Sequence, residues 1–136
     1  MRKYGATIGD DCRIEPGIII HRPDKKIPFK NLILGKGSFI GHKSIIDLTD
    51  KVVFEDYAGV GGYCQIWTHQ TTSLLPPSPE VKANVTLEYG VICYSGVIVS
   101  PGVTVGKNSS IGANSVVNED IPSDSFYAGL PAKKIK

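Results

Sequence analysis

The sequence contains three histidines, His21, His42 and His69, and imidazole can transfer protons because it titrates near neutral pH. His69 has the most informative position. It ends the segment Ile66-Trp67-Thr68-His69 and directly precedes a proline-rich stretch. A histidine at the start of a loop can act as a general base towards a bound substrate. An exposed histidine without a role fits the same position, and the residue types alone leave both interpretations open.

The elements that must position these histidines follow from a six-residue repeat between Val85 and Pro122. An apolar residue returns at every sixth position, and a second, smaller residue follows four positions after each. The first series is Leu87, Cys93, Val99, Val105, Ile111 and Val117, and the second is Val91, Val97, Val103, Ser109 and Ser115. An amphipathic helix repeats its apolar stripe at three and four residues and does not fit this spacing. The spacing predicts a hexapeptide-repeat solenoid.

Six-residue spacing has a simple physical meaning. Two or three extended residues form a short flat side, and Gly, Asn, Ser or Pro residues allow the bend that follows. The chain therefore coils, and successive coils stack as parallel strands about 4.8 Å apart, with apolar residues in columns. One coil is too thin to bury side chains, so the stack creates the core.

The register extends towards the N-terminus with three interruptions. Its earlier members are Ile8, Ile14, Ile20, Leu34, Ile40, Ile46, Phe54, Val60 and Ile66. A polar, proline-containing excursion at about 21–32 interrupts it first, and a two-residue slip follows between Leu48 and Val53. A second excursion, 70–84, holds three prolines and is expected to be stiff, extended and unable to join a β ladder. Excursions from a solenoid often lie on its binding face.

About five coils result, which predicts a prism roughly 25 Å tall, followed by a short C-terminal tail, 123–136. The chain of 136 residues is long enough for one domain, 1–136. Its net charge of +2 argues against a dedicated nucleic-acid surface. No segment has the length and apolarity of a signal peptide or a membrane span, so we expect a cytoplasmic protein without membrane insertion.

The three cysteines, Cys12, Cys64 and Cys93, are far apart and form no Cys-x-x-Cys motif. All three fall on inward positions of the repeat. They are therefore predicted to be reduced thiols inside the prism.

Three C-terminal segments carry a family resemblance. Ile111-Gly112-Ala113-Asn114-Ser115-Val116-Val117 is followed by Asp120-Ile121-Pro122 and then by Ala128-Gly129-Leu130-Pro131-Ala132-Lys133-Lys134-Ile135. This arrangement resembles the signature of the hexapeptide-repeat acyltransferases, most of all the maltose, galactoside and colanic acid sugar O-acetyltransferases. The resemblance implies an all-β, left-handed parallel β-helix that assembles as a homotrimer. The handedness rests on the resemblance, because general crossover statistics favour the opposite hand.

The resemblance also implies a reaction. An acetyl group would move from acetyl-CoA to a hydroxyl or amine of a sugar, free or linked to a nucleotide or lipid, in the synthesis of cell-surface polysaccharides, and no metal is expected. His69 would be the catalytic base, removing a proton from the attacking group and returning it to the thiolate. The group that stabilises the oxyanion, O- versus N-transfer and the acyl group stay open.

Four residues match positions at which the family contacts coenzyme A. Ser95 and Ala113 match contacts to the pantetheine, and Lys133 and Lys136 match basic positions near the phosphates. Either lysine alone also fits a solvated tail. Asn118-Glu119 departs from the family, where Thr-Lys is frequent, so one phosphate contact is in doubt.

Three residues are candidates for acceptor binding. His42 and Asp47 match the region in which the family holds acceptor hydroxyls by hydrogen bonds. His42 also fits a corner residue exposed to water. Trp67 is expected to point away from the core, towards a sugar ring or a subunit interface, and Tyr63 is expected to do the same.

Two other kinds of protein remain as alternatives. The same β-helix carries zinc in the γ-class carbonic anhydrases, through three histidines that leave one position for water. Here the histidines occupy different places in their hexads, and no two lie five residues apart as in that family, which weakens the zinc interpretation. A β-helix can also be a non-catalytic binding scaffold.

Overall fold

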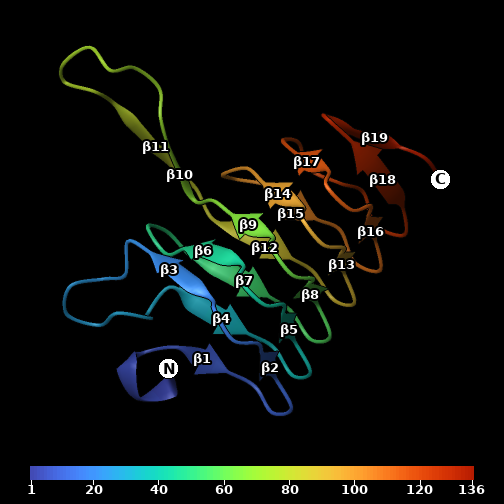
Figure 1. Ribbon diagram of the computed structural model, residues 1–136, viewed down its shortest axis with the longest axis horizontal. Coiled ribbons are helices and arrows are strands. Elements are labelled where there is room, and N and C mark those ends of the chain that lie inside the picture. Colours follow the sequence, from blue (N-terminus) through green and yellow to red (C-terminus); the bar gives the residue numbers. More distant parts are fainter.

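The computed structural model describes residues 1–136, which form a three-sided parallel β-helix (Figure 1). We call its three sheets sides A, B and C. Side A contains β1 (Thr7–Ile8), β4 (Leu32–Leu34), β7 (Val52–Phe54), β12 (Val85–Leu87) and β15 (Thr104–Val105). Side B contains β2 (Arg13–Ile14), β5 (Phe39–Ile40), β8 (Gly59–Val60), β13 (Ile92–Cys93) and β16 (Ser110–Ile111). Side C contains β3 (Ile19–His21), β6 (Ile45–Asp47), β9 (Gln65–Ile66), β14 (Ile98–Val99) and β17 (Val116–Val117). Each of the five coils therefore gives one strand to each side.

The six-residue repeat forms the core, as predicted. On side C, Ile46 pairs with Ile66 and Ile66 pairs with Val99, and all three side chains are fully buried. The smaller residues of the repeat are also buried, including Ser38, Ser44, Ala58, Cys64, Val91, Val97, Val103, Ser109 and Ser115. The large and small columns together fill the inside of the prism.

Both ends of the prism are covered by short elements. The 3-10 helix η1 (Arg2–Tyr4) lies at the first coil, where the Arg2 side chain donates hydrogen bonds to the carbonyl oxygens of Ile8 and Gly9. At the other end, β18 (Phe126–Gly129) adds to side B and pairs in turn with β19 (Ala132–Lys134). The predicted tail is therefore largely a β hairpin. No helix in the structure has the length and apolarity needed to cross a membrane.

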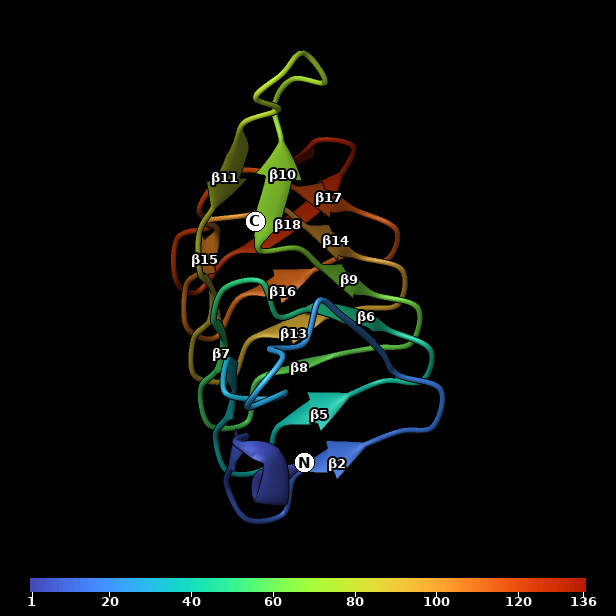
Figure 2. The ribbon, with the colours of Figure 1, turned by 90° about the vertical axis from the view of Figure 1, so that its left-hand side faces the viewer.

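The interruptions of the repeat all occur at one edge of the prism, between sides C and A, which we call edge CA. Residues 22–31 connect β3 to β4, residues 48–51 connect β6 to β7, and residues 67–84 connect β9 to β12. The other edges, AB and BC, carry short turns. The two excursions and the slip predicted from the sequence are therefore neighbours in space (Figure 2).

The second excursion forms an arm that projects well beyond the stacked coils (Figures 1 and 2). Its strands β10 (His69–Thr71) and β11 (Glu80–Lys82) pair with each other in antiparallel fashion. The prediction that this segment joins no ladder is wrong. Pro76 and Pro77 lie outside the paired residues, so they leave the ladder intact.

All three cysteines are free, as expected. Cys64 and Cys93 are fully buried, and Cys12 is half-buried in the first coil. Burial raises the pKa of the Cys64 and Cys93 thiols, because the thiolate loses its hydration inside the prism. These cysteines belong to the core.

Candidate active site

Asp47 is the centre of a hydrogen-bond network at edge CA. It is the last residue of β6 and is fully buried. Its Oδ1 accepts hydrogen bonds from the Thr49 hydroxyl at 2.7 Å and the Thr49 backbone N–H at 3.2 Å. Its Oδ2 accepts from the Thr68 backbone N–H and the Thr68 hydroxyl, each at 2.9 Å. Both oxygens are therefore satisfied within the protein, which makes a buried carboxylate tolerable.

The network keeps Asp47 ionised. Burial by itself raises the pKa of a carboxyl group, but hydrogen bonds from His69, Thr49 and Thr68 outweigh it and lower the pKa of Asp47 to about 2. Asp47 therefore gives edge CA a fixed negative charge at neutral pH.

His69, the first residue of β10, uses this charge. Its Nδ1 lies 2.6 Å from Asp47 Oδ2 and 3.2 Å from the Thr49 hydroxyl. An ionised carboxylate can only accept a hydrogen bond, so Nδ1 carries the proton and Nε2 holds the free lone pair of the neutral ring. Nε2 has no hydrogen-bond partner in the chain, and the side chain is 11% exposed. The imidazole is therefore held in the tautomer whose Nε2 can accept a proton.

His21 lies against this imidazole, a neighbour that sequence reasoning missed. His21 ends β3 and pairs with Asp47 in the next coil. Its ring is nearly parallel to that of His69, with centroids 5.5 Å apart, and it meets the ring of Trp67 edge-on at 5.3 Å. Trp67 points away from the core, as predicted, and its Nε1 donates to Gln65 Oε1 at 2.9 Å. Two aromatic side chains thus flank the base.

The same residues could hold a metal ion. His21, Asp47 and His69 each offer a ligand atom, and these atoms lie within 4.8 Å of one another. However, binding through Asp47 Oδ2 would compete with the hydrogen bonds from Thr68 and His69. The donor set suits zinc in number and type, but its carboxylate is already engaged.

The residues expected to contact coenzyme A lie at edge BC. Ser95 is in the turn between β13 and β14, and Ala113 is in the turn between β16 and β17. The two turns stack directly, because the Asn114 N–H donates to the Ser95 carbonyl at 2.9 Å, and both Ser95 and Ala113 are exposed. They form a continuous strip along the prism axis.

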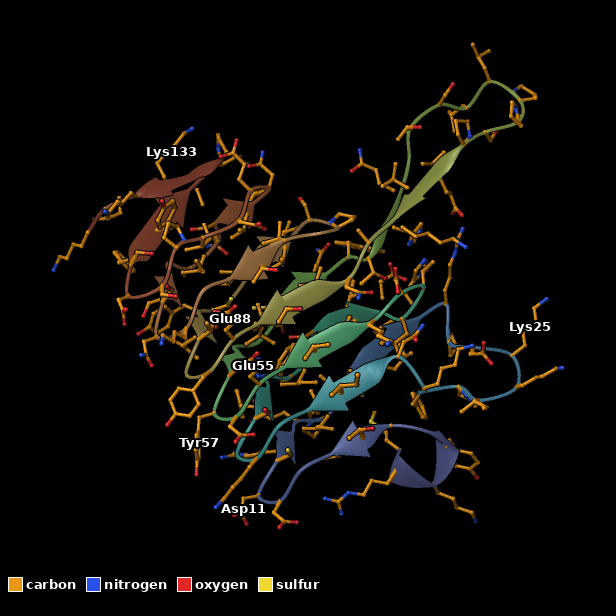
Figure 3. All side chains as sticks on the ribbon, turned by 180° about the vertical axis from the view of Figure 1, so that it is seen from behind. Asp11, Lys25, Glu55, Tyr57, Glu88 and Lys133 are labelled. Carbon is orange, nitrogen blue, oxygen red and sulfur yellow. The ribbon has the colours of Figure 1, made fainter.

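The remaining candidates are placed apart from His69. His42 is exposed in the β5–β6 turn of edge BC, with its Nδ1 3.4 Å from Glu15 Oε1. The structure therefore does not bring His42 and His69 together within one chain. Lys133 on β19 and Lys136 at the C-terminus are exposed at the last coil, and Figure 3 shows Lys133 at this end.

Asp47 has a different setting from the one expected. It was a candidate for binding acceptor hydroxyls, but it is buried and its carboxylate oxygens face Thr49, Thr68 and His69. Sequence reasoning also missed both threonines. One feature of the sequence could have pointed to these threonines. Every interruption of the repeat follows the third hexad of a coil, so all the interrupting segments begin at the same edge of the prism.

Comparison with known proteins identifies the repeat and the fold. Residues 90–119 match a sequence family described as the hexapeptide repeat of succinyl-transferase. No match is found among curated proteins. The fold is that of the hexapeptide-repeat acetyltransferases, the left-handed parallel β-helix, as the sequence motifs predicted.

Three solved structures define this likeness. A hexapeptide-repeat containing acetyltransferase, VCA0836 from Vibrio cholerae, is 24% identical over 99% of this chain and 75% of its own, with a TM-score of 0.88. A maltose O-acetyltransferase from Clostridium difficile 630 is 27% identical over 98% and 71%, with a TM-score of 0.86. A mutant of AntD, an N-acyltransferase from Bacillus cereus, in complex with dTDP and coenzyme A, is 23% identical over 97% and 73%, with a TM-score of 0.82. VCA0836 is also solved with acetyl-CoA bound.

The Asp47 network predicts acid-sensitive stability. Because the folded-state pKa is lowered from 3.8 to about 2, the ionised group stabilises the fold above pH ~4, and this contribution is lost as the pH falls towards about 2. The expected loss is about 2 kcal/mol of unfolding free energy. Urea unfolding of the wild type and of Asp47→Asn across this range measures it, and the variant should lose most of the dependence.

Asp11→Asn is the matched control, because Asp11 is exposed and its φ of 59° is tolerated by Asn. It should follow the wild-type profile. An Asp47→Asn variant that kept the full acid dependence would contradict the assignment.

Proposed function

We propose that this protein is an acetyl-CoA-dependent acyltransferase that acetylates a hydroxyl or amine of a sugar, with His69 as the general base. The observation that carries the proposal is the short contact between His69 Nδ1 and the buried Asp47 carboxylate. It leaves Nε2 as the accepting nitrogen on a partly exposed ring.

The reaction follows from this arrangement. Nε2 of His69 removes the proton from the acceptor hydroxyl or amine as that group attacks the thioester carbonyl. The tetrahedral intermediate then collapses, the carbon–sulfur bond breaks, and the coenzyme A thiolate takes the proton from the imidazolium. Asp47 stabilises the imidazolium in between and holds the ring in one tautomer, so it is a positioning residue. This role replaces the direct acceptor contact expected from the sequence.

Acetyl-CoA is proposed to lie along the strip formed by Ser95 and Ala113. Both residues are exposed in stacked turns, which suits an extended pantetheine arm parallel to the prism axis. Lys133 and Lys136 lie further along, at the last coil, and are proposed to meet the nucleotide phosphates as point charges. The bound coenzyme A in the structures similar to this chain supports acetyl-CoA as the donor.

The proposed site needs more than one copy of the chain. His69 lies at edge CA and Ser95 at edge BC, on opposite borders of side C. The outer face of side C carries the partly or fully exposed side chains of Ile19, Ile45 and Ile98, which suit contact between protomers. We propose a homotrimer in which the His69 edge of one protomer faces the coenzyme strip of the next.

The acceptor is proposed to be a sugar, free or linked to a nucleotide or lipid, used in the cytoplasm to build cell-surface polysaccharides. A maltose O-acetyltransferase and an N-acyltransferase share the fold, which supports a sugar acceptor and leaves the attacking atom as oxygen or nitrogen. Trp67 and His42 stay candidates for contacting the acceptor, His42 from a neighbouring protomer.

A zinc enzyme related to the γ-class carbonic anhydrases is the second candidate. It is favoured by one observation, the proximity of His21, Asp47 and His69. Metal analysis of protein purified without chelator separates the two functions: acyl transfer predicts no stoichiometric zinc, whereas about one zinc per chain, lost in His21→Gln and His69→Gln, would favour the metal site.

Replacing the proposed base should abolish turnover. His69→Gln keeps a polar side chain but cannot take up a proton at this position, so kcat should fall about a thousandfold. Release of free thiol from acetyl-CoA in the presence of a panel of sugars measures the effect. Light scattering should show an unchanged oligomer for the variant.

Gln70→Ala is the control, because Gln70 is the next residue of β10 and is exposed. It should retain wild-type turnover. Unchanged turnover in His69→Gln would remove the proposed base.

Filling the coenzyme strip should impair donor binding. Ala113→Leu adds bulk where the pantetheine is proposed to pass, so the KM for acetyl-CoA should rise at least about tenfold. Ala113→Ser, which adds one small atom, should stay within about threefold of the wild type. Steady-state kinetics with varied acetyl-CoA decides, and an unaltered KM in Ala113→Leu would place the donor elsewhere.

A further inference from the structure

A polar cavity of about 330 Å³ opens at edge CA, beside the candidate base. One wall is the excursion 22–31, another is the base of the arm, and Leu48 and Thr49 lie between them. The lining residues are Arg22, Pro23, Asp24, Lys25, Lys30, Asn31, Leu48, Thr49 and Lys82. Four of them are cations and one is a carboxylate, so the cavity has a net positive charge.

Local hydrogen bonds fix the excursion wall. Asp24 Oδ1 accepts from the backbone N–H groups of Lys26 and Ile27, each at 2.8 Å, and Oδ2 pairs with Lys30 Nζ at 2.7 Å. Asn31 Nδ2 donates to the Leu48 carbonyl at 3.0 Å, which ties the excursion to the next coil. The cavity therefore has a defined wall.

Two of the four cations are left without a carboxylate. Asp24 pairs with Lys30, and Glu80 on the arm pairs with Arg22. Lys25 and Lys82 form no ion pair in the chain. The hydrogen bond from the Arg22 side chain lowers the pKa of Glu80. The cavity thus presents positive charge that the chain does not neutralise.

The cavity adjoins His69 through two residues. Lys82 is the direct antiparallel partner of His69, so their side chains leave the same face of the arm. Thr49 lines the cavity, and its hydroxyl lies 3.2 Å from His69 Nδ1. A ligand held by Lys82 would therefore lie close to the His69 side chain.

Within one chain, this cavity is separate from the proposed coenzyme strip. Lys25 and Lys133 lie at opposite sides of the molecule in Figure 3, on the first excursion and on the last β hairpin. The two lysine clusters of one chain can therefore meet different phosphate groups, and competition between coenzyme A and pyrophosphate tests this separation in the proposed trimer.

We propose that the cavity binds a phosphate or diphosphate on the acceptor, so that the substrate is an anionic, diphosphate-linked sugar and not a neutral one. This inference rests on the proposed function for the identity of the acceptor. Lys25 and Lys82 supply the free charges, and Arg22 supplies guanidinium donors to the same ligand. The diphosphate anchors the substrate, and the sugar attached to it reaches His69.

Isothermal titration of the intact protein with inorganic pyrophosphate tests the proposal directly, because it requires no catalysis. The double variant Lys25→Ala/Lys82→Ala should bind pyrophosphate at least about tenfold more weakly than the wild type. Lys36→Ala/Lys107→Ala removes the same charge from exposed positions at edge AB and should stay within about twofold. Equal weakening by both double variants would mean that pyrophosphate is held by nonspecific attraction to the net charge of the protein, and it would overturn the proposal.

Coenzyme A provides the second discriminating arm. Lys133→Ala/Lys136→Ala should weaken coenzyme A binding and leave pyrophosphate binding unchanged. Competition between coenzyme A and pyrophosphate for one site, or absence of pyrophosphate binding to the wild type, would overturn the proposal. Loss of acetyl transfer with pyrophosphate binding retained, as expected for His69→Gln, would count against the proposed function alone.

Two further ligands show whether the diphosphate of the acceptor is linked to a nucleotide or to a lipid. UDP-glucose carries a nucleoside diphosphate, and geranylgeranyl diphosphate in detergent micelles carries a lipid diphosphate. Both should bind in a manner that depends on Lys25 and Lys82. Tighter binding than pyrophosphate by one of them identifies a nucleotide-linked or a lipid-linked acceptor, and binding of either that ignores both lysines contradicts the proposal.

Discussion

A single coil of this prism cannot bury its own side chains, and the whole structure depends on the stacking that this imposes. The N–H of Gly59 donates to the carbonyl of Val91 in the next coil, and the same bond recurs along each side. Inward residues are covered by the coils before and after them. Stacking also makes neighbours of residues that hold the same place in successive coils. His21 and Asp47 meet in this way, although they are far apart in the sequence.

The six-residue spacing was sufficient to predict a solenoid of stacked parallel coils, because a coil that must stack repeats the same chemistry at the same place, whereas the left hand was inferred from the family resemblance. The core columns, the extra segments between hexads and the outward direction of Trp67 all follow from counting. His69 could be chosen as a candidate base because it stands where the count stops. Its partners could not be identified, because a hydrogen bond from His69 to Asp47 depends on how a connection folds at the edge, and the repeat does not determine that.

The structure differs from the sequence-based predictions in two further segments, and each difference has a local cause. The segment 70–84 was expected to stay unpaired because it is rich in proline, yet only its tip contains the adjacent prolines, and the proline-free ends pair as β10 and β11. The tail 123–136 leaves the six-residue spacing, so counting gave it no structure. In the fold, β16 is the last coil strand of side B, so its backbone groups at Ser110 and Ile111 would be unpaired without a further strand. β18 pairs with them.

Edge CA accepts connections of very different length between the same two sides without disturbing the coils. The connection after β6 is short, whereas that after β9 forms the whole arm. The length of a connection at edge CA therefore does not change the stacking of the coils. A chain built in this way can alter which molecules it admits by lengthening or trimming the segment 22–31, which contains neither the imidazole of His69 nor the carboxylate of Asp47. Grafting a foreign segment between β3 and β4 is accordingly a practical route to engineering new selectivity on an unchanged frame.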